Sequence, residues 1–159
     1  MHLTIVRHAR ALDKQSWTDD DLLRPLDRHG QRAADGLATL IAAHEVRRIV
    51  SSPAARCRQS VQPLADRLDV DIEEWKELRP DGAGSAIVTE CFANPDFDDA
   101  VLCTHGEVMA PLTRLEDLRN VVRRRELRDG LLTKGSAWRL RISSDGNITK
   151  FDHLVPGRR

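Results

Sequence analysis

A histidine flanked by two arginines follows the first apolar segment of the chain. The residues are Val6-Arg7-His8-Ala9-Arg10, and the uncharged, partly β-branched segment 3–6 before them indicates a buried strand. A strand that ends here would place these residues at the carboxyl edge of a sheet, where open α/β proteins bind their ligands. Two guanidinium groups beside one imidazole favour an anionic ligand, and a phosphoryl group in particular.

Two later segments place similar side chains after predicted strands. Residues 48–51 predict a second strand, followed by Ser52-Pro53 as a helix start and then by Arg56. Residues 100–103 predict a central strand, which is followed by His105. Because the carboxyl ends of parallel strands lie along one edge of a sheet, we expect these side chains to meet Arg7 and His8 there. Two arginines and two histidines can contact all the non-bridging oxygens of a phosphoryl group.

The rest of the chain alternates short strands with helical periodicity. The pattern predicts a loop over 10–28, a third strand over 70–74, helices over 30–44, 53–68, 87–92 and 109–118, and a final hairpin of 136–142 with 148–151. We therefore expect one domain over residues 1–159. Its fold class is α/β, with three layers and a mainly parallel sheet that has helices on both faces and an antiparallel edge hairpin.

Composition restricts the class of protein further. The 159 residues include 25 basic and 25 acidic side chains, a balance that argues against a dedicated binder of nucleic-acid polymers. No apolar stretch is long enough to span a bilayer, and the amino terminus has no signal-peptide pattern, so no membrane partner is expected. Cys57, Cys91 and Cys103 lack metal-ligand spacing. We expect reduced thiols, a cytoplasmic protein and no metal site.

Taken together, the motifs resemble those of the histidine phosphatase superfamily, which has the phosphoglycerate mutase-like fold. The resemblance rests on Arg7-His8-Ala9, on Arg24-Pro25-Leu26 with Gly30 and Ala33, on Ser51-Ser52-Pro53-Ala54-Ala55-Arg56 and on Thr104-His105-Gly106. It implies that His8 is the nucleophile that takes the phosphoryl group, without any cofactor. It also implies that Arg7, Arg56 and a catalytic His105 bind the phosphoryl oxygens. Neighbouring arginine charges are expected to lower the pKa of His8 and keep its imidazole neutral.

The segment expected to supply a general acid departs from the family pattern. Larger members carry a carboxylate after the third strand, where this chain has Glu77-Leu78-Arg79-Pro80-Asp81-Gly82. This Leu-x-Pro-x-Gly segment is similar to the small branch that includes bacterial phosphohistidine phosphatases. Ring-protonated phosphohistidine has a good leaving group, so the resemblance favours phosphohistidine on a protein as the substrate. Glu77, Asp81 or Glu107 could still donate a proton from a neighbouring position.

Two other functions remain open. Segments 103–108 and 134–138 are similar to the phosphatase half of two-domain Nudix–histidine-phosphatase proteins that sanitise nucleotides, although we find no Nudix segment in this chain. A nucleotide or another small phosphorylated metabolite is therefore the second candidate substrate. A catalytically silent module that binds phosphorylated partners is the third reading, because Pro80 occupies the position where larger members of the family carry the general acid. The oligomeric state is left open.

Several remaining side chains are expected to be structural. Arg24 should pair with Asp20 or Asp21, and Trp138 should lie in the core. The basic cluster from Arg119 to Arg128 is typical of a solvated face balanced by acidic neighbours. Cys57, next to Arg56 in the chain, is the thiol most open to oxidation, whereas the other two cysteines are expected to be buried and inert.

Overall fold

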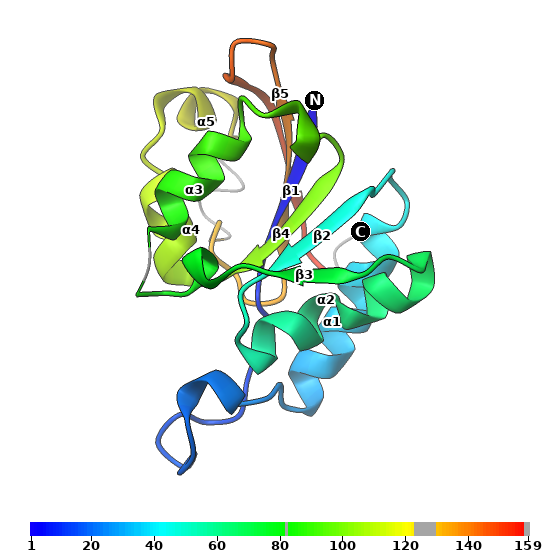
Figure 1. The fold of residues 1–159 in the computed structure, drawn as a ribbon, viewed down its shortest axis with the longest axis vertical. Helices are drawn as coiled ribbons and strands as arrows, with labels where there is room; N and C mark the ends of the chain where they lie inside the picture. The colour runs from blue at the N-terminus through cyan, green and yellow to red at the C-terminus, as the bar shows by residue number, and fades with distance from the viewer. Residues whose placement is uncertain (82, 123–129, 158–159) are drawn as a thin grey trace.

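A six-stranded sheet in the order β3-β2-β4-β1-β5-β6 forms the centre of the structure (Figure 1). The computed structural model describes residues 1–81, 83–122 and 130–157. Four strands are parallel: β1 (His2–Arg7), β2 (Arg48–Ser51), β3 (Ile72–Glu74) and β4 (Ala100–Thr104). The strands β5 (Ala137–Ile142) and β6 (Ile148–Leu154) form an antiparallel hairpin at one edge. The predicted α/β class and the antiparallel edge hairpin are confirmed.

Helices cover both faces of this sheet (Figure 1). On one face lie α1 (Arg28–Ile41) and α2 (Ala55–Leu68). On the other lie α3 (Gly84–Cys91), α4 (Gly106–Leu112) and α5 (Glu116–Val121). Three short 3₁₀ turns complete the described elements: η1 (Asp21–Leu23), η2 (Lys76–Leu78) and η3 (Pro95–Phe97).

Alternating side chains of the central strands fill two cores. In β1, Ile5 packs into the core under α3, α4 and α5, whereas Val6 packs into the core under α1 and α2. In β4, Leu102 packs into the first of these cores and Val101 into the second, and every residue of this strand is buried. Successive side chains of a strand point to opposite faces, so a central parallel strand must be apolar on both. This explains why these strands appear in the sequence as continuous apolar runs.

The same alternation continues into the polar residues that follow the strands. Arg7 pairs with Thr104 in the ladder between β1 and β4. One residue further, the His8 backbone N–H donates to the Thr104 carbonyl at 3.0 Å. His8 and His105 therefore continue on the α2 side of the sheet, and Arg7 on the α4 side.

Several predicted boundaries were wrong: the third strand begins at Ile72 rather than at 70, and the helix predicted over 87–92 begins at Gly84. The helix expected to begin at Pro53 begins at Ala55, because the Ser52 N–H still donates to the Cys103 carbonyl of the sheet at 2.9 Å. The loop expected over 10–28 contains η1, and α1 begins before Gly30 because Asp27 caps it by accepting from the Gly30 N–H.

The prediction of a single helix over 109–118 is also wrong, because this segment belongs to two helices, α4 and α5. Pro111 has no N–H to donate, and Leu115, between the two helices, is extended.

Most of the predicted basic cluster from Arg119 to Arg128 lies outside the described residues; within them, Arg119 is exposed on α5. Within the described ranges, no helix combines the length and apolar character needed to cross a membrane.

We expect Leu102→Ala to destabilise the protein by about 3 kcal/mol, because it removes buried methyl groups and leaves a cavity at the centre of β4. Leu102 is fully buried, whereas Leu23, on η1, is 57% exposed. Leu23→Ala is the matched control and should change the free energy of unfolding by less than about 0.5 kcal/mol. Urea unfolding followed by circular dichroism measures both variants. Equal losses would show that burial in this core does not dominate stability.

Candidate active site

His8 lies directly after β1 with its side chain almost completely buried. Its Nδ1 is 2.8 Å from the Ala9 carbonyl, so a protonated Nδ1 donates there and leaves the lone pair on Nε2. The Ala9 N–H in turn donates to Ser60 Oγ at 2.8 Å, and the Ser60 hydroxyl donates to the Arg56 carbonyl at 2.6 Å. Helix α2 thus positions the carbonyl that orients the His8 ring.

Burial lowers the pKa of His8 to about 3. The hydrogen bond to Ala9 raises this pKa, and the charges of His105, Arg56 and Arg7 lower it further. The expected direction of the shift is correct, but burial rather than the arginine charges is its largest cause. The imidazole is therefore neutral at neutral pH, the state in which Nε2 can act as a nucleophile.

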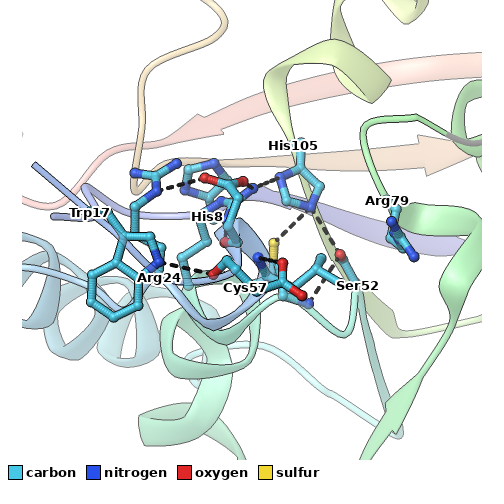
Figure 2. A network of polar contacts seen from close by, with 12 residues as sticks. His8, Trp17, Arg24, Ser52, Cys57, Arg79 and His105 are labelled. Atoms are coloured by element: carbon cyan, nitrogen blue, oxygen red, sulfur yellow. Dashed lines mark hydrogen bonds and ion pairs between the residues drawn. The ribbon is translucent and has the colours of Figure 1, made fainter. Parts of the chain in front are cut away.

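His105 is the N-cap residue of α4 and lies next to His8. The two rings are edge to face, with centroids 5.2 Å apart and an interplanar angle of 66°. His105 Nε2 is 2.9 Å from Ser52 Oγ, and its Nδ1 is 3.5 Å from Arg56 Nη2. A guanidinium can only donate, so Nδ1 accepts and the Nε2–H donates to Ser52. Figure 2 shows His8, His105 and Ser52 together, with Cys57 beside them.

Cys57 contributes a sulfur atom to the same network. Its Sγ is 3.5 Å from His105 Nε2. Burial raises the pKa of the Cys57 thiol, but hydrogen bonds with Cys103 and His105 outweigh this effect and lower the pKa to about 6. Burial raises the pKa of Cys91 to about 11 and that of Cys103 well above its ordinary value. All three cysteines are free and buried, and the latter two have the burial and raised pKa expected of inert thiols.

Arg56 and Arg7 each carry a buried donor that no described residue accepts. Arg56, the second residue of α2, is 4% exposed. Its terminal nitrogens contact Asp21, whereas its Nε has no hydrogen-bond partner among the described residues. Arg7 donates from Nη1 to the Leu132 carbonyl, and its Nε also lacks a partner within the described chain. Buried N–H groups without acceptors are costly. The two arginines therefore bring positive charge and an unused donor each to this edge of the sheet, a combination that suits an anion.

A glycine makes room for the Arg7 guanidinium. A Cβ atom on Gly106 would lie 2.8 Å from Arg7 Nη2 and 2.9 Å from its Cζ. On the other side of β1, the Gly135 N–H faces the carbonyls of Arg7 and His8 at 3.1 and 3.2 Å. Burial lowers the pKa of Arg7, and the charge of Glu107 raises it.

The three candidate proton donors are all exposed. Glu77 lies on η2, and Asp81 forms an ion pair with Arg79 at 3.1 Å. Figure 2 places Arg79 apart from the two histidines, on the side of Ser52. Glu107, on α4, is the candidate whose charge acts on a site arginine, Arg7. In the described ranges, the hydrogen-bond partners of the two histidines include no carboxylate.

Sequence reasoning did not assign roles to three residues of this network. Ser52 was predicted only as a helix start, and Asp21 only as a possible partner of Arg24, a pairing that the structure confirms at 2.8 Å. Ser60 belongs to no motif. Its signal is its spacing: it lies four residues after Arg56 and four before Leu64, on the buried face of α2. A small polar residue at a core-facing helical position indicates a specific hydrogen bond.

Comparison with known proteins identifies the class. Residues 3–84 match the model that describes the histidine phosphatase superfamily (branch 1). The chain belongs to this superfamily, as its motifs indicated.

One curated relative and several solved structures are similar over nearly the whole chain. An 8-oxo-(d)GTP phosphatase of Mycolicibacterium smegmatis is 30% identical over 158 residues, which are 96% of this chain and 47% of that protein. The chain thus spans about half the length of this relative.

Among solved structures, the protein histidine phosphatase SixA complexed with tungstate has a TM-score of 0.73 at 23% identity, covering 98% of this chain and 97% of that one. A SixA protein of Agrobacterium tumefaciens has a TM-score of 0.79 at 23% identity, with 98% of each chain covered. A mycobacterial glucosyl-3-phosphoglycerate phosphatase shares the fold with a TM-score of 0.65 at 16% identity, with 99% of each chain covered.

We expect Gly106→Ala to weaken anion binding with little loss of stability. The added methyl group would displace the Arg7 guanidinium, which is the flexible end of its side chain and can move away. Vanadate affinity, measured by calorimetry, should fall by about tenfold, which corresponds to the loss of one charge-assisted hydrogen bond. Unchanged affinity with Arg7 in place would show that the methyl group is accommodated without moving the arginine.

His8→Gln should reduce the pH dependence of stability. The pKa of His8 is about 3 in the folded chain and about 6.5 in the unfolded chain. The unfolded state therefore binds more protons in this window, and stability is lost as pH falls through it. Between about pH 7 and pH 4.5, His8 should contribute about 2 kcal/mol of that loss.

Urea unfolding at the two pH values, with the exposed His29→Gln as control, measures the His8 contribution. An equal loss in wild type and His8→Gln would contradict a depressed pKa.

Proposed function

We propose that this chain is a metal-independent phosphatase that works through a phosphohistidine intermediate on His8. The observation that supports this most directly is the juxtaposition at one sheet edge. A buried, neutral His8 with its lone pair on Nε2 lies 5.2 Å from His105, measured between ring centroids. Arg7 and Arg56 bring two unpartnered buried donors to the same edge, counting partners among the described residues.

In the first step, His8 Nε2 attacks the phosphorus atom, and the bond from phosphorus to the leaving group breaks. Negative charge in the transition state lies on the three equatorial oxygens, which the two guanidinium groups are placed to bind. His105 joins them when its ring is protonated, because the neutral ring already donates to Ser52 and accepts from Arg56. In the second step, water attacks the phosphorus of phospho-His8. Inorganic phosphate leaves, and His8 returns to its neutral form.

The preferred substrate is phosphohistidine on a protein. In the described part of the chain, neither site histidine hydrogen-bonds a carboxylate that could protonate the leaving group. A leaving group that departs as a weak base, such as the neutral imidazole released from ring-protonated phosphohistidine, needs such an acid least. The similarity of fold to the SixA proteins supports the same choice.

A nucleotide is the second candidate, favoured by the relative named as an 8-oxo-(d)GTP phosphatase. The leaving group of a phosphoanhydride is itself a phosphate, which also departs without strong acid catalysis. Glu107 is the carboxylate that could assist either substrate, since it lies close enough to Arg7 to raise its pKa.

Phosphate release from a panel of substrates tests the proposal. The panel contains a phosphohistidine peptide, nucleoside di- and triphosphates including oxidised guanine forms, and simple phosphomonoesters. His8→Ala should lower turnover by at least about 10³-fold, since it removes the nucleophile. The phosphohistidine peptide should be the best substrate, and a nucleotide optimum would favour the second candidate. Absence of His8-dependent turnover, with vanadate still bound, would identify a silent phosphate-binding module.

A further inference from the structure

We infer that Asp21 is a positioning residue for the reaction, acting through Arg56. The inference rests on the proposed function, in which Arg56 binds the phosphoryl oxygens. Asp21 belongs to the 3₁₀ turn η1, in the segment between β1 and α1. Arg56 lies at the start of α2 and contacts η1 from there.

Asp21 holds the outer edge of the Arg56 guanidinium with two different groups. Arg56 Nη1 donates to the Asp21 backbone carbonyl at 2.7 Å, and Nη2 forms an ion pair with Asp21 Oδ2 at 3.0 Å. A guanidinium is a rigid planar fork, so fixing both terminal nitrogens also fixes the direction of the Nε–H. That Nε–H is buried and meets no acceptor in the described chain. The contact with Asp21 thus determines where Arg56 aims its unused donor.

The Asp21 carboxylate is itself held in place by Arg24. Arg24 Nε donates to Asp21 Oδ1 at 2.8 Å, while Arg24 Nη1 donates to the Leu12 carbonyl at 2.7 Å. Asp20 caps the turn by accepting from the Leu22 N–H at 2.9 Å, and within the described residues it forms no hydrogen bond or ion pair with Arg56. The two adjacent aspartates therefore separate two roles, since Asp20 shapes the turn and Asp21 orients the arginine.

A carboxylate beside an anion site also repels the anion. Whether Asp21→Asn lowers or raises activity therefore depends on whether the positioning of Arg56 or this repulsion is the larger effect. The Asp21 side chain is 42% exposed, so water screens its field at the phosphoryl group. Arg56 is only 4% exposed, and its contact with Asp21 is direct. Removing the carboxylate would leave a buried cation unpaired and free to turn. Positioning therefore outweighs repulsion, and Asp21→Asn should lower activity.

A double-mutant cycle between Asp21 and Arg56 tests the inference. Asp21→Asn should lower kcat by about tenfold with a smaller change in KM, because equatorial charge grows in the transition state. Asp20→Asn is the matched control on the same turn and should change kcat by less than about threefold. Asp21→Glu, which keeps the charge, should recover part of the loss. In an Arg56→Lys background, which lacks the planar fork, adding Asp21→Asn should change kcat by less than about twofold.

Vanadate affinity, measured by calorimetry on the same variants, tests the inference independently of turnover. Asp21→Asn should weaken vanadate binding by at least about fivefold in the Arg56 background and not in the Arg56→Lys background. Three outcomes would each overturn the inference. Asp20→Asn and Asp21→Asn could weaken binding equally, or Asp21→Asn could raise the affinity. The fold-changes of Asp21→Asn and Arg56→Lys could also multiply in the double variant, as for independent residues. A wild-type chain that binds vanadate but hydrolyses nothing would refute the proposed function, while the binding cycle would still decide the role of Asp21.

Discussion

The parallel pairing of β1 with β4 is the interaction on which the candidate site depends. The ladder sets Arg7 opposite Thr104, and the His8 N–H extends it by one bond of 3.0 Å to the Thr104 carbonyl. A slip of one residue would move Ile5 and Val6 to the wrong cores, so apolar packing on both faces holds the register. The same register sends His8 and His105 to one face and Arg7 to the other. The two histidines are therefore brought together by the cores beneath them and need no direct bond to each other.

Burial has opposite consequences for the groups at this edge. For His8 it removes the second proton, which leaves Nε2 in the state that the proposed nucleophile requires. For Arg7 and Arg56 it creates donors that the described chain does not satisfy, a cost that structural arginines generally avoid. Both arginine charges act on His8, so an anion bound there would lie in the field of both. The side chains that lower stability in the free protein are thus the ones suited to bind a phosphoryl group.

The parts of this site that depend on local sequence patterns could be predicted. Short apolar runs before Arg7, His8 and His105 predict the ends of strands. Because parallel strands share an edge, the sequence also predicts that these residues lie close together. The start of α2 did not follow, because the Ser52 N–H belongs to the sheet rather than to the helix. Nor did the contact of Asp21 with Arg56, which joins residues 35 apart through a turn without periodicity. Side-chain contacts made from an irregular segment depend on its tertiary path, which no local pattern encodes.

One chemical requirement is common to the two substrates proposed above. Phosphohistidine presents a phosphoramidate bond, and a nucleoside di- or triphosphate presents a phosphoanhydride bond. Both bonds release a leaving group of low basicity, whereas an alkyl phosphate releases an alkoxide that must be protonated. The candidate acids Glu77 and Asp81 are exposed and contact neither histidine within the described residues. In the proposed reaction, a site that binds the transferred group but makes little provision for the leaving atom would select substrates by the bond they present to His8. On this argument, discrimination between a protein and a nucleotide depends on the residues around the edge rather than on the catalytic set.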